Sequence, residues 1–189
     1  MTLKNTMNPR TLLLTAMILS ASLWRLIFAS SHTPLHDFTP IGAMALFGGC
    51  YFSDKWKAYL VPICTLWLTD LALNYFVYYH QLTFFYQGFI WTYGAFAVMV
   101  MVGTFIKKVN IGNVLLASLV TALLHYIITD FGTWIDGRMY PLTWEGFTAC
   151  YVAAIPYFLR MLEANLVFGG LMFGAFELAK KKFPVLAVR

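Results

Sequence analysis

Residues 111–130 read Ile-Gly-Asn-Val-Leu-Leu-Ala-Ser-Leu-Val-Thr-Ala-Leu-Leu-His-Tyr-Ile-Ile-Thr-Asp, and the first acidic or basic charge in this stretch is its last residue, Asp130. An α-helix needs about 20 predominantly apolar residues to cross the hydrocarbon core of a bilayer. The stretch has that length and composition, so it predicts a transmembrane helix. This stretch also indicates the fold class, because a chain with one transmembrane helix is an integral membrane protein, and its other segments must be compatible with the bilayer.

The remainder of the chain has the same apolar character. Its residues are 60% hydrophobic and 11% charged, against about 25% charged in soluble domains, and the mean hydropathy is +0.70. Polar breaks divide the 189 residues into six apolar segments. They lie at about 11–30, 39–53, 57–79, 86–106, 111–130 and 152–180. We therefore predict an all-α integral membrane protein, a six-transmembrane-helix bundle that forms a single domain over residues 1–189.

Some segment boundaries carry local signals. Thr39 and Pro40 are typical of a helix N-cap followed by the first helical residue, so they predict the start of the short second segment. Pro156 is expected in the first turns of the sixth segment, where a proline is tolerated. The connection 131–151 is the longest, and a short interfacial helix is expected in it from Thr143 onward.

Lysine and arginine are distributed unevenly between the connections. Ten of the thirteen basic residues fall on one side of the predicted membrane. They are Lys4, Arg10, Lys55, Lys57, Lys107, Lys108, Lys180, Lys181, Lys182 and Arg189. Because connections rich in Lys and Arg stay in the cytoplasm, we predict both termini to be cytoplasmic, in a bacterial inner membrane. The net charge of +5 then reflects the lipid bilayer as a partner and not nucleic acid.

Charged and amide side chains within the segments point to a site. In this orientation they all fall in the outer half of the membrane. They are Arg25, Asp70, Asn74, His125, Asp130, Arg160, Glu163 and Asn165. Ionisable residues in a bilayer usually face the bundle interior and have a function. Since the inner half is free of charge, a continuous ion path is disfavoured. We predict a polar and aromatic cavity that opens outward between segments one, three, five and six, as in small-molecule sites.

The residues predicted to bind the solute combine these polar groups with aromatic neighbours. They are Arg25, Asp70, Asn74, Trp67, Trp91, His125, Asp130, Trp134, Tyr140, Arg160 and Glu163. A structural interpretation stays open for most of them. Arg160 and Glu163 are three residues apart and could neutralise each other on one helix. Arg25 could pair with Asp70 or Asp130 to hold helices together. The tryptophans and tyrosines could form an interfacial belt.

Nothing in the spacing of potential ligands predicts a metal site or a catalytic residue. The three cysteines have neither metal-site spacing nor an even count, and all three are expected to be buried apolar thiols. They are Cys50, Cys64 and Cys150. His32, His36 and Asp37 share the first outer connection without the fixed spacing of a metal site. His125 on an apolar helix is typical of a hydrogen-bonded helix contact.

Two pairs of small residues lie four positions apart, in the cytoplasmic halves of the first and sixth segments. They are Ala16 with Ser20 and Gly170 with Gly174. Small residues at this spacing let membrane helices approach closely. They indicate either packing inside the bundle or a docking face for a partner membrane protein.

The chain also contains five distinctive stretches. They are Asp37-Phe-Thr-Pro-Ile-Gly-Ala-Met-Ala-Leu-Phe-Gly-Gly (37–49), Leu68-Thr-Asp-Leu (68–71), Thr129-Asp-Phe-Gly-Thr-Trp (129–134), Tyr140-Pro-Leu-Thr (140–143) and Cys150-Tyr-Val-Ala-Ala-Ile-Pro-Tyr-Phe (150–158). Together they resemble a family of small six-helix bacterial membrane proteins of unassigned function. In architecture that family resembles the S-components of energy-coupling factor transporters. Those are membrane subunits that bind vitamins and related micronutrients, including solitary forms for cobalamin.

The resemblance to S-components implies an outward pocket roofed by loops and a partner that supplies energy. A small-residue face on the first helix would contact a transmembrane coupling subunit that works with ATPases. Ala16 and Ser20 match that face, with Ser in place of the usual second Ala. Cobalamin is one conceivable substrate. Cys64 is the only third-segment candidate for the cobalt-ligating cysteine of the cobalamin type, and that role is not carried over.

Three functions are therefore compared. The first is a substrate-binding membrane subunit for uptake of a vitamin-like solute. The chain has no G-x-x-x-x-G-K-[ST] motif, so ATP hydrolysis would come from a partner. The second is a membrane enzyme acting on a lipid or isoprenoid, in which Asp70, His125, Asp130 and Glu163 do acid–base work or hold a divalent metal. The third is a structural or assembly protein. The first is preferred, and a non-enzyme is therefore expected.

Overall fold

The computed structural model describes residues 8–28 and 37–187, and all regular structure within these ranges is helical. It comprises six α-helices, a π-helical turn and a short 3-10 turn. The α-helices are α1 (Pro9–Phe28), α2 (Ile41–Tyr51), α3 (Lys55–Leu73), α4 (Phe89–Thr104), α5 (Ile111–Ile135) and α6 (Trp144–Lys182). The π turn Asn74–Tyr78 continues α3, and the 3-10 turn Pro184–Leu186 follows α6. His32 and His36 lie outside the described residues.

Four of the described helical elements are long and apolar enough to cross a membrane: α1, α3 with its π turn, α5 and α6. The other two are shorter, with 11 residues in α2 and 16 in α4. At 1.5 Å per residue, α2 covers about 16 Å, roughly half of the ~30 Å hydrocarbon core. The chain is therefore an all-helical protein with four helices of spanning length, while the six spans and the cytoplasmic termini remain predictions.

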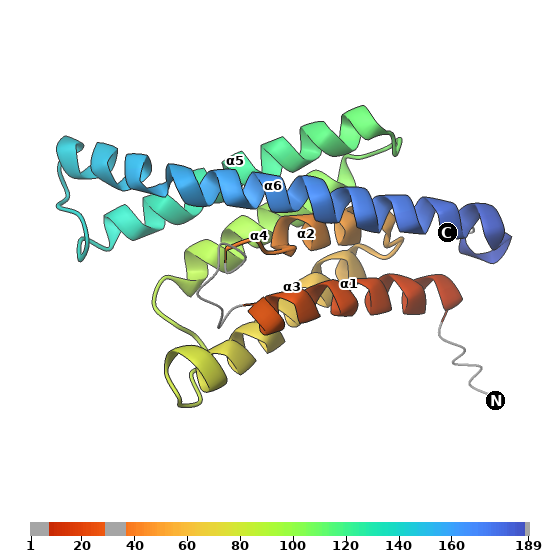
Figure 1. Ribbon diagram of the computed structural model, residues 1–189, viewed down its shortest axis with the longest axis horizontal. Helices are drawn as coiled ribbons and strands as arrows, with labels where there is room; N and C mark the ends of the chain where they lie inside the picture. The colour runs from red at the N-terminus through yellow and green to blue at the C-terminus, as the bar shows by residue number, and fades with distance from the viewer. Residues whose placement is uncertain (1–7, 29–36, 188–189) are drawn as a thin grey trace.

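α2 is the centre of the bundle, and every residue from Gly42 to Tyr51 is buried. It packs against α4, α6 and α3, with α5 beside α6 and α1 beside α3. Figure 1 shows the pair α5 and α6 on one side of α2 and the pair α1 and α3 on the other. Glycines permit the closest approach, because a Cβ atom on Gly49 would overlap the Val100 carbonyl of α4, and one on Gly103 would overlap Leu46 of α2.

A single polar residue connects three of these helices. Asn165 of α6 is fully buried and lies over Gly42 of α2, where a Cβ atom would collide with its side chain. Its Nδ2 donates to the Ser118 carbonyl and to Thr121 Oγ1 of α5, both at 3.4 Å. Asn165 thus holds α2, α5 and α6 together and does not belong to a cavity wall.

The predicted boundaries hold for most helices, but the sixth segment is much longer than expected. Thr143 is the N-cap of α6, and its Oγ1 accepts from the Gly146 N–H at 3.2 Å. The helix then continues unbroken through Pro156, so the expected separate interfacial helix is the first part of α6. Thr39 does not cap α2, because the N-cap residue is Pro40 and no side chain bonds there.

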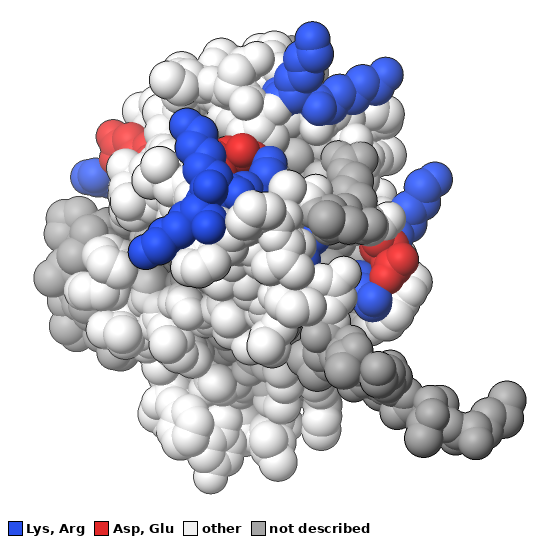
Figure 2. Space-filling model, turned by 90° about the vertical axis from the view of Figure 1, so that its right-hand side faces the viewer, with Lys and Arg blue, Asp and Glu red and all other residues white. Residues whose placement is uncertain are grey.

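Both described chain ends lie at the same end of the bundle, called here the terminal end (Figure 1). Figure 2 looks onto it and shows most of the visible Lys and Arg side chains spread around it. Arg10 is different, because it is only 4% exposed. Its guanidinium donates to the carbonyls of Leu186 at 2.9 Å and Tyr51 at 2.8 Å. The sequence predicted only a topological role for Arg10, whereas the structure shows that it ties α1 to α2 and to the C-terminal turn.

Candidate functional site

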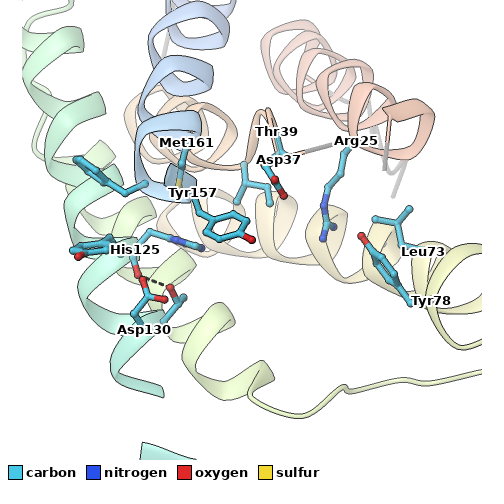
Figure 3. A pocket seen from close by; sticks show the side chains of 13 residues that line it. Arg25, Asp37, Thr39, Leu73, Tyr78, His125, Asp130, Tyr157 and Met161 are labelled. Carbon is cyan, nitrogen blue, oxygen red and sulfur yellow. Dashed lines mark hydrogen bonds between the residues drawn. The ribbon is translucent and has the colours of Figure 1, made fainter. Parts of the chain in front are cut away.

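The opposite end of the bundle, called here the cavity end, contains a cavity of about 300 Å³. Its walls come from α1, the end of α3 with its π turn, α5 and α6, and from the segment that leads into α2. These are the four segments between which the sequence predicted a cavity. Figure 3 shows Arg25 and Tyr78 on one side of it and His125 and Asp130 on the other, with Tyr157 and Asp37 between them.

Arg25 is held by a buried acidic partner. Its Nη2 lies 2.5 Å from Asp70 Oδ1, and its Nη1 donates to Thr69 Oγ1 at 2.8 Å. The second carboxylate oxygen of Asp70 accepts from the Tyr93 hydroxyl at 2.7 Å. Asp70 is 3% exposed and does not line the cavity itself. It neutralises and orients Arg25, which does, so the pairing that the sequence left open between two carboxylates is with Asp70.

The facing wall, from α5 and α6, is organised differently. Thr129 Oγ1 donates to the His125 carbonyl at 2.8 Å, and the Tyr126 hydroxyl donates to the Tyr151 carbonyl at 2.7 Å. The Asp130 carboxylate and the His125 ring line the cavity. Neither has a hydrogen bond or ion pair to another described protein group. Two strong polar groups thus face the cavity with their bonding capacity unused.

A second, more open groove of about 800 Å³ adjoins the first cavity. It is formed by residues 85–92 and 129–139, and Thr129 lines both spaces. Trp91 lies in this groove, packed on Gly132, with its ring centroid 5.4 Å from that of Phe131. Burial raises the pKa of the Tyr86 phenol in the same groove above its usual value. Trp91 therefore belongs to the neighbouring groove and not to the predicted cavity.

The other predicted aromatic residues hold the connections at the cavity end. Trp67 stacks on Phe84 with ring centroids 6.4 Å apart, and Trp134 donates from Nε1 to the Pro141 carbonyl at 3.1 Å. Neither these tryptophans nor Tyr140 is among the residues that line the cavity. The two tryptophans instead contact the connections that follow α3 and α5.

Asn74 has a comparable supporting role. It is 3% exposed, and its Nδ2 donates to the Thr83 carbonyl at 3.0 Å. This bond joins the start of the π turn to the loop that follows it. Asn74 was predicted to contact the solute, but the structure places it behind the wall formed by Leu73 and Tyr78.

Arg160 and Glu163 do not reach the cavity. Arg160 Nη1 lies 3.3 Å from Glu163 Oε2, and the two side chains are 47% and 56% exposed. Met161 and Tyr157 of the same helix line the cavity instead. The predicted placement of the two charges in the cavity wall is therefore corrected, and the alternative of mutual neutralisation on one helix describes their geometry.

Several cavity residues had no assigned role in the sequence. Tyr126, Tyr157 and Phe158 form aromatic walls, but 18% of the chain is aromatic, which hides the few that matter. Asp37 was grouped with nearby histidines in a loop, and the structure places it against the cavity. The one available signal for Tyr157 and Phe158 was their position directly after Pro156 in a distinctive stretch.

Cysteines and small residues complete the predicted set. Cys50 and Cys150 are buried as predicted, but Cys64 is exposed. No group of three or more metal-ligating side chains occurs among the described residues. Ala16 and Ser20 are exposed on α1, and a Cβ atom on Gly170 or Gly174 would meet open space. Both small-residue pairs are thus accessible and do not mediate packing inside the bundle.

Comparison with known protein families gives a match over nearly the whole chain. No curated protein and no solved structure matches the sequence. Residues 5–186 match a family of unknown function, DUF6580. That match covers nearly the whole chain and is consistent with the family of unassigned function expected from the sequence, so the chain belongs to DUF6580.

Proposed function

We propose that this protein is the substrate-binding membrane subunit of an uptake system for a small, vitamin-like solute. The observation that carries the proposal is the cavity between α1, α3, α5 and α6. One of its walls contains an arginine fixed by a buried carboxylate, and the other contains Asp130 and His125, whose side chains have no hydrogen bond or ion pair to another described group. A cavity with aromatic walls and a few convergent polar groups is typical of small-molecule sites.

The size of the cavity limits the solute. About 300 Å³ is at the lower end of the ~300–1,000 Å³ that ligand pockets usually enclose. A single heteroaromatic or amino-acid-sized molecule suits this space. A corrinoid of the size of cobalamin would need more space than this cavity alone provides.

The direction of uptake would follow from the orientation of the bundle in the membrane. With the basic terminal end in the cytoplasm, the cavity end faces outward and meets the solute first. The sequence has no P-loop motif, so a partner with ATPase subunits would supply the energy. The exposed Ala16 and Ser20 on α1 offer that partner a close-approach face. Rocking of the whole bundle would then present the cavity to the other side of the membrane.

Native mass spectrometry of the protein, released from mild detergent, tests this proposal. We expect a small molecule to co-purify and to be lost in the paired variant Arg25→Gln/Asp70→Asn, which removes both charges together and leaves neither unpaired. The matched control is Arg160→Gln/Glu163→Gln, which neutralises an exposed ion pair on α6. The proposal is wrong if no solute is retained by the unmodified protein, or if the paired cavity variant retains it as well as the control does.

The structure supports the enzyme alternative less well than it supports a binding subunit. His125 and Asp130 line one cavity and could transfer protons to a bound lipid. Of the other two groups considered for acid–base work, however, Asp70 is saturated by Arg25 and Tyr93, and Glu163 faces away from the cavity. A membrane enzyme therefore remains the second candidate, on the single observation that His125 and Asp130 share the cavity.

A further inference from the structure

We infer that the solute is a small organic cation, held by the Asp130 carboxylate and by the aromatic walls of α5 and α6. This inference rests on the proposed function, because it assumes that the cavity is a binding site. It names the chemical class of the solute, which neither the family nor the fold provides.

The charge of the cavity is the first argument. Among the described residues that line it, Arg25 is the only lysine or arginine, and its positive charge is already compensated by Asp70 at 2.5 Å. Asp130 adds a carboxylate to which no described side chain bonds, so Arg25, Asp70 and Asp130 together carry a net negative charge. A negative, partly enclosed site concentrates cations and repels anions.

The unused carboxylate of Asp130 is the second argument. The Cys150 thiol donates to the Asp130 backbone carbonyl at 3.5 Å and not to its side chain. No described protein group donates to the carboxylate. A half-buried carboxylate in a cavity is stabilised by a partner with positive charge or hydrogen-bond donors. Since the described protein supplies no such partner, a cationic solute is the group that fits this position.

The aromatic side chains are the third argument. Tyr126, Tyr157 and Phe158 line the cavity from the same two helices as Asp130, and Tyr78 lines it from the opposite side. The ring of Tyr126 is fixed by its bond to the Tyr151 carbonyl and lies 5.4 Å from the ring of Phe158. Aromatic faces attract organic cations within about 6 Å of the ring centre. A carboxylate bordered by such rings favours an ammonium or a cationic heteroaromatic ring.

A metal ion fits this site less well. Within the described ranges, no three His, Cys, Asp or Glu side chains are placed to bind one ion. A cavity of about 300 Å³ also exceeds the space that a bare ion needs. Its dimensions and apolar walls correspond to an organic molecule.

Matched pairs of ligands that differ in charge test this inference. The first pair is choline and its uncharged isostere 3,3-dimethylbutan-1-ol, and the second is 1-methylnicotinamide and nicotinamide. Binding to the full-length protein in detergent is measured by calorimetric titration and by ligand-induced thermal stabilisation. We expect at least one cation to bind about tenfold or more tightly than its neutral partner, which is the scale of a partly desolvated cation–π contact.

Asp130→Asn should remove that preference. The substitution keeps the size of the side chain and breaks no contact within the described protein, so the melting temperature without ligand should not fall. Glu163→Gln, an exposed carboxylate on α6, is the control and should leave the preference intact. Equal binding of each pair, binding of none of the four probes, or a preference that survives Asp130→Asn would overturn the inference. An anionic or neutral molecule found by mass spectrometry would overturn it too, while leaving the proposed binding function standing.

Discussion

The two ends of the bundle each contain an arginine from α1, and the surroundings of the two arginines differ. At the terminal end, Arg10 donates to two backbone carbonyls and lies 5.6 Å from the Phe176 ring centre. The neighbouring Tyr51 hydroxyl donates to Glu177 at 2.6 Å, and Lys180 completes the chain with Glu177 at 2.8 Å. At this end, the polar groups around Arg10 bond to one another and connect α1, α2, α6 and the C-terminal turn.

The cavity end has a similar network on only one side. Arg25, Asp70 and Tyr93 satisfy one another, yet the side chains of Asp130 and His125 have no hydrogen bond or ion pair to another described protein group. The two ends thus differ: the side chains around Arg10 bond to one another, whereas two polar side chains at the cavity remain available. Such side chains lining a cavity are candidate contacts for a ligand.

The largest effect is expected from Asp70→Ala, which leaves the Arg25 guanidinium, 16% exposed, without its counter-charge. Loss of one partner of a buried ion pair costs about 3–5 kcal/mol. The free energy of unfolding in detergent, from denaturant titration, measures it. In the double variant Arg25→Met/Asp70→Leu most of this loss should be recovered. A single variant as stable as the unmodified protein would mean that the pair is solvated and contributes nothing.

A large effect is also expected where α2 and α4 touch. Gly103→Ala places a Cβ atom against the Leu46 carbonyl, and overpacking against a backbone group should cost about 3 kcal/mol. Gly94→Ala is the matched control on α4, because a Cβ atom there meets open space. Thermal unfolding in detergent should separate the two substitutions. If both are equally tolerated, α2 is not the packed centre of the bundle.

Arg10→Met should have a smaller effect, because it removes hydrogen bonds to carbonyls but leaves most of the apolar contact with Phe176. We expect a loss of about 2 kcal/mol, with solute binding unchanged. Lys181→Met is the control, since Lys181 is exposed at the same end. Reduced solute binding in Arg10→Met without a matching loss of stability would contradict the separation of the two ends.

The smallest effect is expected from Arg160→Gln/Glu163→Gln. Exposed ion pairs contribute about 0–1 kcal/mol, so stability should change little, and binding should not change at all. A marked loss of solute binding in this variant would indicate that Arg160 and Glu163 do contact the solute, as the sequence predicted.

The sequence predicted the helical segments well because the apolar runs and their polar breaks are sharp. It also predicted which four segments surround the cavity, although α6 contributes Tyr157 and Met161 and not the charged residues that had indicated it. The sequence did not predict which side chains face the cavity when this depends on how a helix is rotated about its own axis. α6 is apolar on nearly all sides, so no stripe indicated that Met161 faces inward while Arg160 and Glu163 face outward.

Two further features depended on contacts between distant parts of the chain. Arg10 resembled a membrane-flanking charge, and only its proximity to Leu186 and Tyr51 shows that it closes the terminal end. The central position of α2 was equally hidden, because its uniform apolar composition is common to buried and lipid-facing helices. Its glycines were visible in the sequence, but their partners on α4 were not.

The most direct measurement is an experimental structure of the protein purified from its native membrane without added ligand. We predict density for one small molecule between α1, α3, α5 and α6, with a positively charged group against the Asp130 carboxylate and the Arg25–Asp70 pair intact. A cavity filled by protein side chains, with Asp130 bonded to another residue of the chain, would contradict a solute-binding site at this position.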